Sequence, residues 1–226
     1  TLAYLNAATN AGAQFREGVR IDSIAVSGGL ATGVHLGDGS LETGDVIVNA
    51  AGAWAGFVRG LEDDRIHFYP VRGQILCFDA RPGLVAPSLF SGAGILVPRR
   101  DGRLLAGSIF EDAGFNKSVT LDGMERILRA VRAMVPSIAS VPFREAWAGL
   151  RPASDDLLPV FGPSPTVANV FYAAGHFRSG ILLSALTGEV IAHLVKGRRP
   201  SIDLAPFSPA RFRDGSARPV KLDQMI

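Results

Sequence analysis

Apolar residues near the start of the chain recur at helical spacing and then give way to short strand-like runs. Residues 1–11 place apolar side chains along one side of a helix, and Gly12 is suited to end it. Glycine-rich turns at 28–29 and 37–40 then separate three runs with strand character, which are residues 19–26, 30–36 and 46–49. This part of the chain therefore predicts a helix, a meander of antiparallel strands and a buried apolar strand.

The middle of the chain predicts an antiparallel sheet with one helix. Its expected elements are a β-rich stretch at 66–78, a hairpin formed by 94–98 and 103–109, and a helix at 121–135. Pro70 and Gly73 are expected bend points in the first of these. Thr120 or Asp122 is expected to cap the helix, and Pro136 to stop it.

The last third of the chain predicts a strand followed directly by a helix. An apolar strand at 170–174 runs through a glycine-rich turn at 175–180 into a helix at 181–196. We therefore expect an α/β protein of mixed α+β character, in which a discontinuous first domain carries an inserted, mostly antiparallel second domain. The expected division is a first domain at 1–60 and 146–200, an insertion at 61–145, and a C-terminal tail at 201–226.

Composition narrows the class of protein. The chain has 226 residues, of which 47% are hydrophobic and 19% charged, as in globular domains. The formal net charge is +2, and the excess positive charge lies in 196–226, which favours a solvated surface over a nucleic-acid site. Cys77 is the single cysteine, so the sequence predicts neither disulfides nor a multi-cysteine metal site and fits a reducing, cytoplasmic location. No signal peptide and no apolar run of membrane-spanning length is seen.

The glycine-rich turn before the last helix is the strongest local feature. A helix N-terminus presents unpaired N–H groups and partial positive charge, which stabilise an anion or an electron-rich ring. Gly175 and Gly180 allow close approach, Arg178 adds a cation, and His176 is a further candidate for ligand contact. The alternative is a plain strand-to-helix turn with a surface arginine.

A second candidate is Arg151 in the sequence WAGLRP. A guanidinium on a stiff element, here followed by Pro152, suits bidentate capture of a carboxylate. The alternative is a structural arginine that closes a salt bridge. Arg151 and Arg178 together would be able to hold one substrate carboxylate if the fold brings them together.

Several other chemistries find no support in the sequence. The four histidines have no metal-binding spacing, so no metal site is expected. Ser179 and Ser184 lack the strand–GxSxG–helix setting of a hydrolase nucleophile, and no catalytic acid or base stands out. Neither a P-loop nor a G-x-G-x-x-G dinucleotide motif occurs.

Five motifs in order resemble a known family. They are VIVNAAGAWAG at 46–56, YPVRGQIL at 69–76, LVPRRDGRLLAG at 96–107, WAGLRP at 147–152 and GHFRSGILL at 175–183. Together they resemble the flavin-dependent amine oxidases of the D-amino-acid-oxidase superfamily, and within it the glycine oxidase branch. The resemblance implies the remainder of an FAD-binding, Rossmann-like domain with an inserted antiparallel or mixed-sheet substrate domain. The missing G-x-G-x-x-G unit and the start at Thr1 without methionine suggest that the chain is the C-terminal part of a longer enzyme.

The resemblance also implies site residues. Those matched to FAD are Ile21, Ala51, Gly52, Trp54, Gly149, Gly175, His176, Ser179, Gly180, Ile181 and Leu182. Those matched to the substrate are Arg151, Arg178, Phe110 and Ile95. Glycine oxidases carry His and Tyr where this sequence has Ala93 and Ile95, so we expect a more apolar pocket wall and a substrate that need not be glycine.

The implied reaction is oxidation of a small amino acid or secondary amine, such as glycine, sarcosine or a D-amino acid, to an imino acid, with dioxygen reoxidising the FAD. The expected partners are thus a small amino acid and dioxygen, with neither nucleic acid nor membrane, in a protein able to form a homo-oligomer. Two alternatives stay open: an FAD-dependent dehydrogenase of a hydroxy acid that uses another acceptor, and an inactive or structural fragment without flavin.

Overall fold

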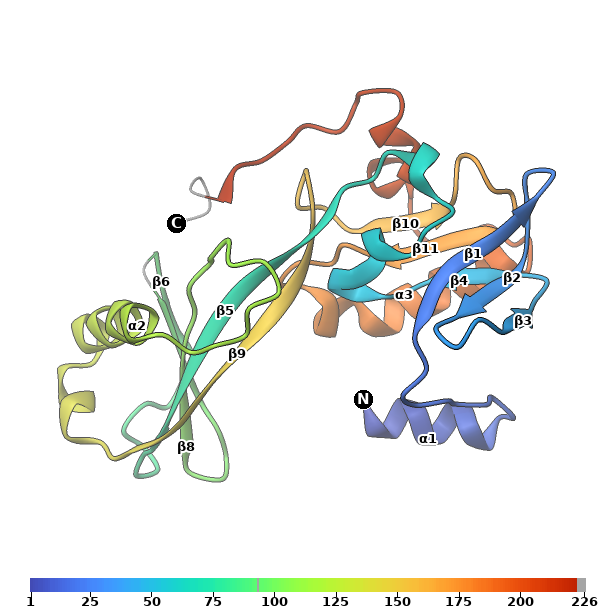
Figure 1. Ribbon diagram of the computed structural model, residues 1–226. Coiled ribbons are helices and arrows are strands. Elements are labelled where there is room, and N and C mark those ends of the chain that lie inside the picture. The colour runs from blue at the N-terminus through green and yellow to red at the C-terminus, as the bar shows by residue number, and fades with distance from the viewer. Residues whose placement is uncertain (93, 223–226) are drawn as a thin grey trace.

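Two long paired strands, β5 and β9, connect the two parts of the molecule (Figure 1). The computed structural model describes residues 1–92 and 94–222. Toward one end of the pair, β6, β7 and β8 complete a five-stranded sheet that is covered by α2, and toward the other end lie two three-stranded sheets with α3. The mixed α/β fold class predicted from the sequence is confirmed.

The five-stranded sheet has the order β6-β7-β8-β5-β9, and each neighbouring pair is antiparallel. Its strands are β5 (Phe68–Asp79), β6 (Leu89–Ser91), β7 (Gly94–Pro98), β8 (Arg103–Gly107) and β9 (Phe143–Ser154). Helix α2 (Leu121–Met134) buries Ile127 and Val131 against Leu76 and its neighbours on one face of this sheet. The opposite face of the β5–β9 pair is left for the site.

The ends of α2 follow the signals in its sequence. The side chain of Thr120 accepts a hydrogen bond from the backbone N–H of Gly123 at 3.2 Å, which caps the helix. Gln74 on β5 donates to the same hydroxyl at 3.0 Å, and its carbonyl oxygen accepts from the backbone N–H of Thr120 at 3.0 Å. These bonds fix the first turn of α2 onto the middle of β5.

The other part of the molecule joins segments that are far apart in sequence. One sheet has the order β1-β2-β3, with β1 (Ile21–Ser27), β2 (Leu30–Leu36) and β3 (Leu41–Thr43). The other has the order β10-β11-β4, with β4 (Ile47–Asn49), β10 (Val160–Pro163) and β11 (Val170–Ala174). Strands β4 and β11 are parallel although the whole five-stranded sheet lies between them in sequence. Helix α3 (Gly180–Val195) follows β11.

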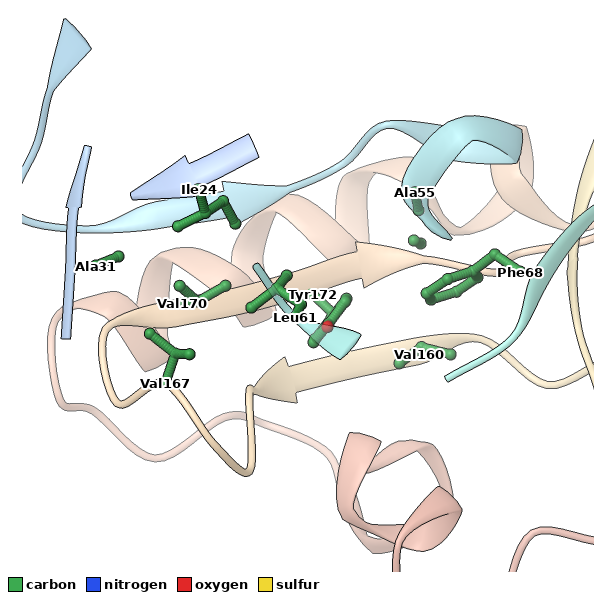
Figure 2. Close-up of a cluster of buried hydrophobic side chains, with 10 residues drawn as sticks. Ile24, Ala31, Ala55, Leu61, Phe68, Val160, Val167, Val170 and Tyr172 are labelled. Carbon is green, nitrogen blue, oxygen red and sulfur yellow. The ribbon is translucent and has the colours of Figure 1, made fainter. Parts of the chain in front are cut away.

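The core of this part is a cluster of apolar side chains that come mainly from β1, β2, β10 and β11, with Ile47 of β4 packed against it (Figure 2). Phe68, at the start of β5, packs here, whereas Val71 belongs to a second cluster and Leu76 to the cluster under α2. One strand therefore takes part in all three apolar cores, and its position ties them together.

A fully buried carboxylate lies within the first core. Asp64 accepts hydrogen bonds from the hydroxyls of Ser164 at 2.7 Å, Thr166 at 2.6 Å and Tyr172 at 2.7 Å. Burial and the bond to Asp64 raise the pKa of Tyr172, so its hydroxyl stays a donor. This network holds the segment before β5 against β11 and the β10–β11 turn.

The N-terminal helix α1 (Leu2–Asn10) forms as predicted but has no buried residue. Leu2 and Tyr4 are 75% and 64% exposed. Figure 1 shows α1 beside the body of the molecule, linked to β1 by an extended segment. Among the described residues, no helix is both long and apolar enough to cross a bilayer.

Several expectations need correction. Pro70 and Gly73 do not interrupt β5, which is continuous from Phe68 to Asp79, because the strand pairs with β9 along nearly its whole length. Strands β3, β6, β9 and β10 were not expected from the sequence, and the boundary expected between residues 145 and 146 falls inside β9. The segment expected to be a solvated tail contains the buried Arg211, which donates two hydrogen bonds to the buried Asp156 at 2.6 and 3.0 Å.

We predict that Asp64→Ala lowers the free energy of unfolding of the protein by about 3–5 kcal/mol, because three buried hydroxyls lose their acceptor. The matched control is Asp63→Ala, next in the chain but exposed, which should change the free energy by less than about 0.5 kcal/mol. Denaturant unfolding of both variants measures this, and equal effects would contradict the structural role of the buried network.

Candidate functional site

The position of Arg151 is set by the pairing of β5 with β9. Gly149 lies opposite Gly73 and Arg151 opposite Val71, so all four face the same side of the two strands. The guanidinium of Arg151 lies across Gly73, where a Cβ atom would collide with both of its terminal nitrogens. Gly73 leaves room for this side chain, and a larger residue at position 73 would displace the guanidinium.

Three contacts from the segment after β8 hold the guanidinium. One terminal nitrogen of Arg151 donates to the carbonyl oxygen of Ile109 at 3.1 Å, and the other donates to the hydroxyl of Ser108. The guanidinium carbon lies 4.7 Å from the centre of the Phe110 ring, a cation–π contact. Because a guanidinium has five N–H donors, it keeps others free for a ligand.

The turn before α3 brings Arg178 to the same place. Gly175 has a φ of +71° and Phe177 a φ of +49°, so the chain turns sharply after β11. The backbone N–H of Phe177 donates to the carbonyl oxygen of Pro152 on β9 at 2.7 Å, and its ring stacks on Phe110 with centroids 5.5 Å apart. These contacts fix the turn that carries Arg178 beside the strand that carries Arg151.

The two arginines are not neutralised by the protein. Among the described residues, neither Arg151 nor Arg178 has a carboxylate at ion-pair distance. Burial and, secondarily, the positive charge of Arg178 lower the pKa of Arg151. A bound carboxylate would relieve both effects, so the pair is suited to take up a small anion.

The expected substrate residues meet in one open cavity of about 960 Å³. Arg151, Arg178, Phe110 and Ile95 all line it, together with Ile181 from the start of α3. Ala93, expected on the same wall, lies outside the described residues. The cavity is therefore apolar on its walls and cationic on one side.

The expected cofactor residues surround two neighbouring hollows and the face of the β5–β9 pair. Ile21, Ala51 and Trp54 line one hollow of about 620 Å³, with Gly52 beginning the adjoining 3-10 helix Gly52–Phe57. His176 and Gly180 line another, of about 610 Å³, beside α3. The structure thus groups these residues locally rather than in a single cavity.

The start of α3 and the open side of Gly149 fit the ring end of a flavin. Ser179 precedes the helix without a side-chain cap, and Ile181 and Leu182 are 95% and 85% exposed. A Cβ atom on Gly149 would meet nothing within 4 Å, so a flat ring has room to approach the strand there. The residues that would hold the FAD diphosphate are not among these, because the sequence has no G-x-G-x-x-G motif.

His176 is held as a neutral ring. Its Nε2 atom lies 3.0 Å from the hydroxyl of Thr187 on α3, and its ring packs 5.0 Å from that of Phe161. Burial lowers the pKa of His176. It therefore fixes the turn to the helix and adds no positive charge near neutral pH.

Other residues of the site were not predicted from the sequence. Ser108, Ile75 and Phe90 line the main cavity, and Arg126 adds a third cation to it. Gly73 was visible in the sequence but was interpreted as a bend. Within the part of the chain that the structure describes, no three His, Cys, Asp or Glu side chains form a metal site.

Fold and cavity together define a mixed α/β protein with an open cavity lined by apolar side chains and arginines. The family description "FAD dependent oxidoreductase" (DAO) matches residues 1–194. Hydrogen cyanide synthase subunit HcnC of Pseudomonas aeruginosa is 35% identical over 93% of this chain, and glycine oxidase of Pseudomonas putida is 31% identical over 86%. The chain spans about half the length of these curated relatives, 51% and 53%.

A solved structure supports the same assignment. The glycine oxidase of Geobacillus kaustophilus superposes with a TM-score of 0.86 at 32% identity, covering 93% of this chain and 56% of that one. The chain belongs to the DAO family of FAD-dependent oxidoreductases. The family match confirms the expected class, an FAD-dependent oxidoreductase, and the expected FAD cofactor.

We predict that Gly73→Ala displaces the guanidinium of Arg151 and lowers the free energy of unfolding by about 1–3 kcal/mol through overpacking. Its cross-strand neighbour supplies the control: Gly149→Ala points into open space and should leave the stability of the flavin-free protein nearly unchanged. Thermal unfolding and a crystal structure of each variant provide the measurement. An undisplaced Arg151 in Gly73→Ala would refute this interpretation.

We also predict a pH dependence of stability from His176. Its pKa is lowered in the folded protein, whereas the unfolded chain has an ordinary histidine pKa of about 6.5. As the pH falls below about 6.5, the unfolded state takes up a proton that the folded state does not, so stability decreases. Denaturant unfolding between neutral and mildly acidic pH should show a shallower loss in His176→Gln, and an identical slope would count against it.

Proposed function

We propose that the protein containing this chain oxidises a small amino acid or secondary amine, of the glycine, sarcosine or D-amino-acid type, to an imino acid with dioxygen as the acceptor. The observation that carries the proposal is the unneutralised Arg151–Arg178 pair in a cavity with apolar walls beside the start of α3. Two relatives named as glycine oxidases support the substrate class. FAD, when bound, would take up the two electrons of the reaction.

In this proposal the chain's own residues mainly position the substrate. Arg151 binds the carboxylate through its free N–H donors, while Ser108 and the carbonyl of Ile109 prevent the guanidinium from turning. Arg178 shares the negative charge from the helix side. The apolar wall formed by Ile95 and Phe110 leaves space for an N-alkyl group, which favours a secondary amine over glycine alone.

The helix N-terminus has an electrostatic part in the same proposal. The first N–H groups of α3 have no intrahelical partner, and the peptide dipoles add partial positive charge there. That charge stabilises a ring whose electron density rises during oxidation of the substrate. In the described cavity lining no carboxylate or imidazole is present, which agrees with an amine that binds uncharged and loses no proton to the protein.

Three other functions are tested alongside. A dehydrogenase that uses another acceptor would consume substrate without releasing hydrogen peroxide, and a cyanide-forming reaction, as the name of the HcnC relative indicates for that protein, would release cyanide. A structural protein without flavin would be colourless. A homo-oligomer and a cytoplasmic location stay predictions, which gel filtration and cell fractionation test.

We predict that Arg151→Met in the intact flavoprotein raises KM for the amino acid by about 30-fold or more, because losing one partner of a desolvated charge pair costs on the order of 2–5 kcal/mol. Arg144→Met, on the same strand but in an exposed pair with Asp79, is the control and should leave KM unchanged. Peroxide release under steady-state conditions gives both values. An unchanged KM in Arg151→Met would remove this residue from the substrate site.

A further inference from the structure

A third arginine, from a different element of the fold, lines the same cavity. Arg126 projects from α2, whereas Arg151 lies on β9 and Arg178 in the turn before α3, and all three line the same space. No acidic side chain is among the described residues that line it. The cavity therefore carries more positive charge than one substrate carboxylate neutralises.

The direction of Arg126 follows from how α2 is fixed. Gly123 packs so closely on Gln74 that a Cβ atom there would collide with the amide group, and Ile127 is buried in the core. Arg126 lies one turn after Gly123 and next to Ile127, at the border of the buried face of the helix, and its exposed side chain is part of the cavity lining. Rotation of α2 to move Arg126 away would break the Thr120–Gln74 bonds.

Arg126 is exposed to solvent and is free to bind a ligand. In the described part of the chain it has neither an ion pair nor a hydrogen bond, unlike Arg129 on the same helix, which pairs with Glu125 at 2.5 Å. The charge of Arg126 helps to lower the pKa of Glu111. That carboxylate already accepts from Arg72 at 2.8 Å and from Gln74.

The space between the cations is apolar. Four apolar side chains share the cavity lining with the three arginines: Ile75, Phe90, Ile95 and Phe110. Such an arrangement suits a molecule with a negative group at each end and a short aliphatic stretch between them.

We propose that Arg126 is a specificity-determining residue that binds a second carboxylate of the substrate, so that the preferred substrates are dicarboxylic amino acids. The second carboxylate is attached either through the nitrogen, as in iminodiacetate, or through the α-carbon, as in D-aspartate. This inference deepens the proposed function, because it assumes that the first carboxylate binds Arg151.

The test compares ligand pairs that differ by one carboxylate. Calorimetric titration of the intact flavoprotein without oxygen measures binding of iminodiacetate against sarcosine and of D-aspartate against D-alanine, and steady-state kinetics gives kcat and KM for the same compounds. The variant is Arg126→Gln, and the control is Arg129→Gln on the solvent side of α2.

We expect Arg126→Gln to weaken binding of the preferred dicarboxylate about tenfold, the value of one charge-assisted hydrogen bond, through Kd and KM rather than kcat. Binding of the monocarboxylates should change less than about twofold, and Arg129→Gln should match the wild type. The pair that responds identifies whether the second carboxylate is on nitrogen or on carbon.

Equal losses for both ligand classes, or no loss for either dicarboxylate, would overturn the proposal. Selective loss of dicarboxylate binding without oxidation of any of these compounds would support the role of Arg126 and reject the proposed oxidase reaction. If the variant oxidises sarcosine or D-alanine as the wild type does, and its binding of dicarboxylates is also unchanged, the oxidase reaction is supported and the role of Arg126 is rejected.

Discussion

The antiparallel pairing of β5 with β9 is the constraint on which the site depends. Its register places Arg151 beside Gly73 and leaves Gly149 open, and a shift of β9 by one residue would turn Arg151 and Gly149 to the face under α2. The same strand offers the carbonyl of Pro152 to Phe177, which fixes the turn carrying Arg178. Since β5 also contributes to each apolar core, packing far from the cavity maintains this register.

The unpaired positive charges in the cavity destabilise the folded protein, and the packing of the rest of the structure offsets this destabilisation. Elsewhere the buried charges are paired: Asp156 with Arg211, Glu111 with Arg72, and Asp64 with three hydroxyls. In the cavity, by contrast, guanidiniums approach one another with no anion among the described residues, and the pKa of Arg151 is lowered as a result. A ligand carboxylate removes this repulsion, so part of its binding energy is stored in the unliganded fold.

Elements with strong local signals were predictable from the sequence. The Thr120 cap with Pro136 bounds α2, and paired glycines mark the β1–β2 hairpin. Strand β9 was not predictable, because much of it is exposed and it contains glycine, arginine and proline, so it has neither alternation nor an apolar run. Its conformation is imposed by β5, which is distant in sequence.

The residues of the candidate site also divide into those that the sequence indicated and those that only the fold reveals. Arg151 and Arg178 were identified through motif order, since nothing in their spacing brings them together, and their convergence is a property of the fold. Gly73 was predicted to be a bend because the sequence does not distinguish a glycine that bends a strand from one that makes room for a neighbouring side chain. Arg126 carries no motif at all, and only the attachment of α2 to Gln74 gives it a direction.

The long separation between β5 and β9 also bears on how the protein folds. The β6–β8 hairpins and α2 lie between the two strands, so each of these local units can form early, whereas β9 joins only after a large loop has closed. Arg151 reaches Gly73 in that late step. Until it occurs, one side of β5 presents unpaired backbone groups, which makes the nascent chain vulnerable to mispairing with another strand.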